Sequence, residues 1–293
     1  MAVPPAFRFM MHLRKACLAF ISAVMLACLL PGPARTVEPV IPNFWDSQER
    51  FIRPNLKGLP RLRFLTVTDF PPFSFIDGDN RLAGFHIDLA RAICTELEVL
   101  PVCQIQALPF AQLNSALKSG QGEAIIAGLP MRRETRRELL FSRPYFHIPG
   151  RFVVRLDSDL RGEGIAALNQ RTVGVISDTA HAAYARSFFE NTNLRLYPDR
   201  TALLAGLQSK QVDAVFADAL SLAFFLQGDV GQACCRFWGG PYLSNRYFGE
   251  GLAIAVPKDS RDLAAGLDYA LRSINDKGIF AELYLRYFPI SLF

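Results

Sequence analysis

Three aspartates stand where buried strands are predicted to end: Asp69, Asp178 and Asp218. In an α/β sheet the carboxyl ends of the strands form the edge where ligands bind, so these carboxylates would line one cleft if the strands assemble into such a fold. Carboxylates in such a place hold cationic groups through charge-assisted hydrogen bonds. The pattern favours a cationic or amine ligand over an acidic one. The structural alternatives are that Asp178 caps a helix and that Asp218 forms a salt bridge.

An aromatic turn follows the first predicted strand. Pro71 and Pro72 hold Phe70 and Phe73 on a stiff, extended turn. The turn comes directly after an apolar strand end, which is a second indication of a ligand site at this edge. A buried Pro-Phe turn without a ligand is the alternative.

Signals for catalysis, metal binding and nucleic-acid binding are weak in this chain. No Ser-His-Asp or Cys-His arrangement is legible, and no CxxC pair supplies zinc-ligand spacing. The formal charge of +5 falls to about +2 once the basic leader is removed. We therefore expect a binding protein without cofactor or metal, rather than an enzyme or a nucleic-acid-binding protein.

The first 34 residues have the composition of a secretion signal. A basic start with Arg8, Arg14 and Lys15 precedes the apolar run 16–30 and a break at Pro31. This run is shorter than the roughly 20 residues that span a bilayer, so we expect a cleaved signal and a periplasmic protein. An uncleaved anchor and acylation of Cys28 are the alternatives.

Strands and helices alternate from Leu62 onward at the spacing of βαβ units. The pattern predicts strands at 123–129, 172–176 and 212–217, and helices at 110–119, 179–190, 201–209, 263–274 and 279–287. Residues 35–59 are rich in proline and are interpreted as an extended lead-in, with Phe44 and Trp45 as surface anchors.

A weak internal repeat indicates two similar halves. Residues 115–128 and 205–218 match without a gap, and each copy is a helix leading into a buried strand. The ends of these strands, Gly128 and Asp218, are expected to face ligand. A single large doubly wound domain is the competing architecture.

Four cysteines remain after the leader: Cys94, Cys103, Cys234 and Cys235. An exported protein meets an oxidising compartment, so bridges are plausible. Cys94 lies on a predicted helix and Cys103 on the next strand, which favours a bridge between them over two buried thiols. A bridge between the neighbours Cys234 and Cys235 is strained, and the sequence leaves their state open.

Six further segments, taken in order with the opening 61–96, resemble the family 3 solute-binding proteins, the periplasmic receptors of ABC importers. They are 113–129, 141–146, 172–184, 207–218, 249–258 and 278–289. The resemblance implies an α/β, type II-like periplasmic binding protein fold, in which two lobes, each a mostly parallel sheet flanked by helices, are joined by two hinge crossings. Lobe 1 would comprise 60–145 plus 251–293 and lobe 2 150–245, with hinges near 145–149 and 246–250.

The resemblance also implies ligand-contacting positions, which fall on Phe70, Phe110, Gly128, Thr179 and Asp218. The two phenylalanines would sandwich the ligand, and Gly128 would let the backbone approach it. Thr179 opens a helix whose N–H groups favour a carboxylate, and Asp218 would take an α-ammonium group. Core packing, a tight turn and simple helix capping are the alternatives.

In the family, an arginine six residues before the Phe of an FS motif usually binds the ligand's carboxylate. In this chain that Phe is Phe141, and the position six residues before it is Thr135, with Arg136 one place later. Arg136 would bind the carboxylate if the loop before Phe141 is one residue shorter than in the family, and Arg132 is a poorer candidate. Bidentate carboxylate binding is geometrically strict, so this slip adds to the case for an amine-like ligand.

The implied function is a monomeric binding protein that closes over an amino acid or amine and delivers it to an ABC permease in the inner membrane. Two rivals remain. One is a sensor-type or accessory periplasmic protein with a degenerate ligand site. The other is a dehydratase on the same fold, with Asp69, Asp178 and His181 as acid and base.

Overall fold

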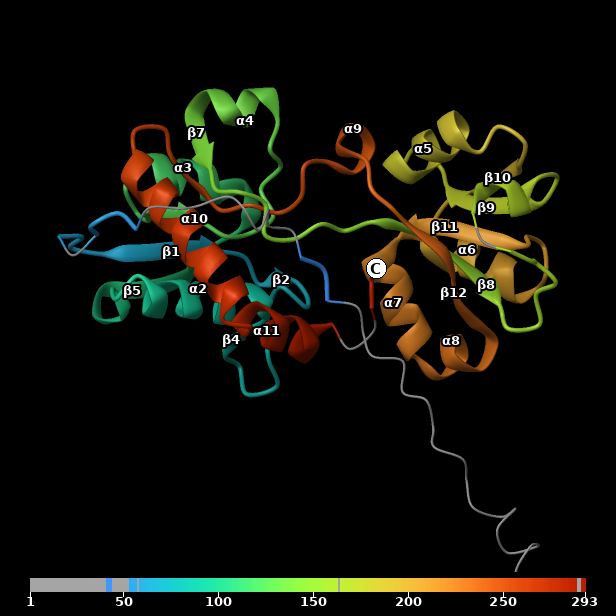
Figure 1. Cartoon of the computed structure of the whole chain (residues 1–293), viewed down its shortest axis with the longest axis horizontal. Coiled ribbons are helices and arrows are strands. Elements are labelled where there is room, and N and C mark those ends of the chain that lie inside the picture. Colours follow the sequence, from blue (N-terminus) through green and yellow to red (C-terminus); the bar gives the residue numbers. More distant parts are fainter. Residues whose placement is uncertain (1–40, 44–52, 57, 163, 289–290) are drawn as a thin grey trace, which may run out of the picture. The chain divides into compact units, whose positions relative to one another are not determined.

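The computed structural model describes residues 41–43, 53–56, 58–162, 164–288 and 291–293. The predicted leader, Cys28 and the anchors Phe44 and Trp45 lie outside these residues. Two five-stranded sheets organise the described chain, and helices pack on both faces of each (Figure 1). We call each sheet with its helices a lobe.

The first lobe contains its main sheet, a small three-stranded sheet and the helices around them. Its strands are β1 (Leu62–Thr66), β5 (Cys103–Ala107), β6 (Ala124–Ile125), β7 (Leu139–Phe141) and β13 (Ala255–Pro257), with β2 (Asp69–Phe70), β3 (Ser74–Ile76) and β4 (Leu82–Ala83) in the small sheet. Its helices are α2 (Phe85–Glu96), α3 (Leu113–Lys118), α4 (Arg133–Glu138), α10 (Arg261–Asp276) and α11 (Ile279–Tyr287), with 3₁₀ turns η1 (Leu100–Val102) and η2 (Phe110–Gln112).

The second lobe has the same plan. Its strands are β8 (Gly150–Arg155), β9 (Thr172–Ile176), β10 (Asn193–Tyr197), β11 (Ala214–Asp218) and β12 (Cys235–Tyr242). Its helices are α5 (Ala180–Phe188), α6 (Arg200–Gln208), α7 (Ala219–Gln227) and α8 (Asp229–Cys234), with the 3₁₀ turn η3 (Ile165–Leu168); the short α9 (Asn245–Phe248) begins the return to the first lobe.

The two sheets share the same strand order and the same pattern of strand directions. The orders are β5-β1-β6-β13-β7 and β10-β9-β11-β8-β12. In each sheet four strands run the same way, and only β13 or β8 is antiparallel to its neighbours. The reversed strand is in each case the first strand reached after the chain crosses from the other lobe. The expected mostly parallel sheets are therefore confirmed.

Period-two alternation places the core on both faces of each sheet. In β1, Leu62 and Phe64 join the cluster under α2, α10 and α11, while Leu65 lies in the cluster under α3. In β11, Phe216 faces the cluster under α5, and Val215 faces the cluster under α6 and α7. Burial on both faces explains why these strands are nearly continuous apolar runs.

The two crossing segments pair with one another. Phe146 and Leu252 form an antiparallel bridge, in which the Leu252 N–H donates to the Phe146 carbonyl at 2.7 Å. The Tyr145 N–H donates to the Leu252 carbonyl at 2.8 Å. The start of the first crossing is therefore hydrogen-bonded to the chain just after the second crossing.

Candidate ligand-binding site

The aromatic turn places Phe70 against Gly128. Phe70 ends β2 and is half-buried, and its ring stacks on Phe73 with centroids 4.7 Å apart. Gly128 has a φ of +70°, and a Cβ atom there would lie 3.0 Å from the Phe70 ring. Glycine at 128 therefore allows both the left-handed backbone and the close approach of Phe70. Asp69, the neighbour of Phe70 in β2, is exposed.

The buried residues His86 and Tyr145 contact each other, and His86 packs against the rings of this turn. The Tyr145 hydroxyl lies 2.7 Å from His86 Nε2, and both side chains are fully buried. The His86 ring packs on Phe73 at 4.9 Å and on the edge of Phe70 at 5.9 Å. Burial lowers the pKa of His86 to about 3, so the ring is neutral at ordinary pH. His86 therefore has a packing role in the structure.

In the second lobe, Asp218 ends β11 and caps α7. Its carboxylate accepts the Ser221 N–H at 2.7 Å and the Ser221 hydroxyl at 2.6 Å. The salt bridge considered as an alternative does not occur within the described part of the chain. Asp218 is only partly buried, so its remaining acceptor capacity is open to a ligand. The sequence missed Ser221, although a serine three residues after a capping aspartate is a readable signal.

Thr179 caps α5 at the end of the neighbouring strand β9. Its hydroxyl accepts the Ala182 N–H at 3.2 Å and donates to the Ile176 carbonyl at 2.8 Å. Asp178 precedes it with a φ of +58° and an exposed side chain, so Thr179 rather than Asp178 is the cap. Because β9 and β11 are adjacent and parallel, Asp178, Thr179 and Asp218 share one edge of the sheet.

His181 lies beside this edge on the first turn of α5. Its ring stacks on Phe248 of α9 at 4.6 Å, and its buried Nε2 has no hydrogen-bond partner among the described residues. Burial lowers the pKa of His181, and the charge of Asp218 acts in the opposite direction. The His181 ring therefore contacts α9 and lies near enough to Asp218 for the two charges to interact.

Phe110 and Arg136 lie on the first lobe, at more exposed positions. Phe110 opens η2, and 47% of its surface is accessible. Arg136 of α4 forms an ion pair with Glu250 of the second crossing at 2.6 Å, and its guanidinium lies 5.8 Å from the Phe141 ring centre. Thr135, at the position where the family has its arginine, makes only local hydrogen bonds among the described residues. Its hydroxyl accepts the Arg132 N–H at 2.9 Å and donates to the Pro130 carbonyl at 2.8 Å.

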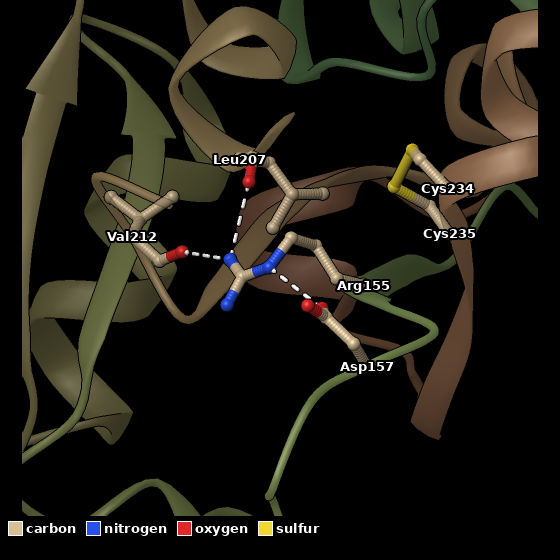
Figure 2. The surroundings of a disulfide bond; sticks show 6 residues. All are labelled: Arg155, Asp157, Leu207, Val212, Cys234 and Cys235. Atoms are coloured by element: carbon tan, nitrogen blue, oxygen red, sulfur yellow. Dashed lines mark hydrogen bonds and ion pairs between the residues drawn. A yellow bond between two sulfur atoms is a disulfide. The ribbon is translucent and has the colours of Figure 1, made fainter. Parts of the chain in front are cut away.

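The structure contains two disulfides. Cys94 of α2 is bonded to Cys103 of β5, as predicted. Cys234 is bonded to Cys235, where α8 ends and β12 begins, which the sequence had left open. Close to this pair, the Arg155 guanidinium donates to the carbonyls of Leu207 and Val212, which joins the end of α6 and the turn before β11 to β8 (Figure 2).

No helix in the part that the structure describes has the length and apolar character of a membrane span. No group of three or more His, Cys, Asp or Glu side chains there is arranged to hold a metal ion.

A hollow of about 650 Å³ lies on the first lobe, away from all eight predicted site residues. Its lining includes Leu56, Lys118 and the start of α10 at Arg261. Its lining contains both acidic and basic side chains, and none of the eight predicted site residues is among them. We assign it no role.

Comparison with known proteins places these features in a family. Residues 62–290 match the profile of the bacterial extracellular solute-binding proteins, family 3. The putative ABC transporter arginine-binding protein 2 of Escherichia coli is 28% identical over 227 residues, covering 78% of this chain and 90% of the relative. The L-arginine-binding protein of Pseudomonas aeruginosa is 29% identical over 228 residues, covering 76% and 86% respectively.

Solved structures share the fold. The L-cystine solute receptor of Neisseria gonorrhoeae superposes with a TM-score of 0.68 at 19% identity, covering 79% of this chain and 94% of the receptor. The second substrate-binding domain of a putative amino acid ABC transporter from Streptococcus pneumoniae gives 0.66 at 22% identity, covering 78% of this chain and all of that domain. At these identities the likeness concerns the two-lobe fold alone.

Proposed function

Since the chain belongs to the bacterial extracellular solute-binding proteins, family 3, we propose that it captures a cationic amino acid or a related amine for an ABC importer. The choice of ligand rests on the edge of the second-lobe sheet where β9 and β11 end. There Asp218, Asp178 and the start of α5 lie at the same edge of the sheet, which supports a site made of carboxylates and helix N–H groups. Relatives named for arginine binding support the same choice.

Each predicted site residue receives a role in this proposal. Phe70, with Phe110, covers the apolar part of the ligand and excludes water. Gly128 provides a close backbone approach beside Phe70. Asp218 accepts the ligand's ammonium group, while the N–H groups that follow Thr179 receive its carboxylate where it has one.

The remaining charged residues select among cations. Asp69, which begins β2, and Asp178, which follows β9, are exposed and add negative charge near the ends of β1 and β9. They attract a second positive group, such as a guanidinium or a side-chain amine. Arg136 is the candidate partner for a ligand carboxylate, provided that it leaves Glu250.

Ligand capture would proceed by hinge closure between lobe 1, residues 60–145 plus 251–293, and lobe 2, residues 150–245. The crossings 145–149 and 246–250 would absorb the rotation. Ligand drives closure only through contacts made in the closed state, so Asp218 and Thr179 matter as much as Phe70. Shifting the equilibrium from 1:99 to 99:1 takes about 5.5 kcal/mol of differential binding, which two charge-assisted contacts and an aromatic sandwich supply.

The leader 1–34 would direct the chain to the periplasm and be cleaved there, and the permease partner would lie in the inner membrane. The protein would act as a monomer and release its ligand unchanged. In support of binding rather than catalysis, the matching family consists of solute-binding proteins, and the relatives compared above are named as arginine-binding proteins.

A thermal-shift screen tests the proposal. L-Arginine, L-lysine, agmatine and putrescine should raise the unfolding temperature, because ligand at a hundredfold excess over Kd adds about 2.7 kcal/mol to the folded state. L-Glutamate should not. No shift with any amine or amino acid would favour the accessory protein with a degenerate site.

A further inference from the structure

The last residues of the chain bind to the second lobe. Leu292 is fully buried and lies in one cluster with Leu220 and Ala223 of α7. The same cluster holds Tyr284 and Phe288 at the end of α11, a helix that packs on α2 of the first lobe. The C-terminus accordingly lies beside α7 (Figure 1).

A buried cation meets the C-terminal backbone at this place. Arg151, on β8 of the second sheet, is only 8% exposed, and its Nη1 donates to the Leu292 carbonyl at 3.1 Å. Its guanidinium lies 4.5 Å from the ring centre of Phe237 on the adjacent strand β12. On the other side, the Leu292 N–H donates to the Tyr284 hydroxyl of α11 at 3.4 Å.

Leu292 is thus held from both lobes, through its side chain, its N–H and its carbonyl. A buried guanidinium is costly unless acceptors and an aromatic face compensate it. The Arg151 Nε has no hydrogen-bond partner among the described residues, so the Leu292 carbonyl is an important acceptor for this cation.

We propose that residues 291–293 are a strap: the surface formed by Arg151, Phe237, Leu220 and Ala223 is a binding site for the chain's own C-terminus, and its occupation restrains the hinge. The strap adds a third connection between the lobes to the two crossings. Arg151 comes two residues after Pro149, at the end of the first crossing, so the strap acts close to the hinge. It limits the range of interlobe angles without covering the ligand edge.

This inference rests on the proposed hinge but not on the identity of the ligand, so it is tested without ligand. Spin labels are attached at Arg137→Cys on α4 and Arg186→Cys on α5, two exposed positions on different lobes. The four cysteines of the described chain are in disulfides and do not take the label. Double electron–electron resonance then compares the full chain with a chain that ends at Ile290.

The strap predicts a broader distance distribution, with a shifted mean, in the truncated chain. Superimposable distributions would overturn the proposal. Leu292→Ala, a milder change, should broaden the distribution in the same direction and lower the unfolding temperature by about 4 °C or more, since a buried leucine side chain is lost. Leu285→Ala, at an exposed position on α11, is the matched control and should change neither.

Arg151→Met separates the strap from a general effect of truncation. It keeps the apolar contact with Phe237 but removes the donor to Leu292. In the full chain it should broaden the distribution, whereas in the truncated chain it should add nothing, because its partner is already absent. Equal broadening in both backgrounds would contradict a direct contact between Arg151 and the strap.

Discussion

Arg136 Nη2 lies 2.6 Å from Glu250 Oε2, so the arginine proposed to receive a ligand carboxylate already binds a carboxylate of its own chain. The pair joins α4 of the first lobe to the second crossing. Both side chains are nearly half exposed, so the pair is weak and a ligand can displace it. Glu250 therefore competes with any ligand that carries a carboxylate and leaves simple amines unaffected.

Replacing Glu250 by glutamine should expose this competition. Glu250→Gln is expected to strengthen L-arginine binding about two- to fivefold, in keeping with an exposed ion pair worth about 1 kcal/mol or less. Agmatine, which lacks the carboxylate, should bind unchanged, as measured by calorimetry. The control is Glu134→Gln on the exposed face of α4. Equal gains for both ligands would remove Arg136 from the site.

Asp218→Asn should separate ligand binding from helix capping. Asparagine caps helices about as well as aspartate, so stability should change little, while the loss of charge should weaken amine binding roughly 10- to 100-fold. Asp199→Asn is the matched control, because Asp199 caps α6 by accepting the Ala202 N–H at 2.8 Å. It should leave both stability and binding unchanged. Undiminished binding by Asp218→Asn would exclude Asp218 as the ammonium acceptor.

The two disulfides should contribute unequally to stability. The Cys94–Cys103 bond closes a loop with a sequence separation of 9, whereas Cys234–Cys235 closes none. In the chain-entropy view, removing the first by Cys94→Ala and Cys103→Ala costs about 2.5–3 kcal/mol. Removing the second in the same way should cost clearly less. Urea unfolding of both double variants measures the difference, and equal losses would refute this ranking.

His86 should make the protein less stable in acid. Its pKa in the folded protein is about 3, below the ordinary 6.5, so the unfolded chain binds the extra proton as the pH falls. The contribution is therefore fully present above pH 6.5 and is lost as the pH falls toward 3. The slope from this group approaches about 1.4 kcal/mol per pH unit.

His86→Gln tests that slope. It removes the titrating group, so the variant should lose less stability than the parent between pH 7 and pH 5 in urea unfolding. Its own stability at pH 7 should be lower, because the Tyr145 hydroxyl loses a well-placed partner. Identical pH profiles would show that His86 does not titrate on unfolding.

The sequence predicted the elements that local periodicity controls. The strand at 172–176 and the helix at 279–287 have the predicted bounds, because apolar runs and flanking turn residues define them. The strand predicted at 123–129 is shorter in the structure: β6 covers Ala124–Ile125, and the chain then turns to place Gly128 beside Phe70. The repeat at 115–128 and 205–218 agrees with the shared strand order of the two sheets.

Contacts between distant residues could not be predicted in the same way. Nothing near Arg136 indicates Glu250, which lies 114 residues away, and nothing near His86 indicates Tyr145. The strap is a similar case, because Leu292 and Arg151 are 141 residues apart. Such pairs depend on how the elements pack, whereas the capping roles of Thr179 and Asp218 depend on neighbours within three residues.

Isothermal titration of the mature protein with L-arginine and L-glutamate tests the central claim most directly. The Asp178–Asp218 edge predicts saturable, one-to-one binding of L-arginine, and L-glutamate should bind far more weakly or not at all. Tighter binding of L-glutamate, or no heat with L-arginine, L-lysine, agmatine and putrescine alike, would contradict the account.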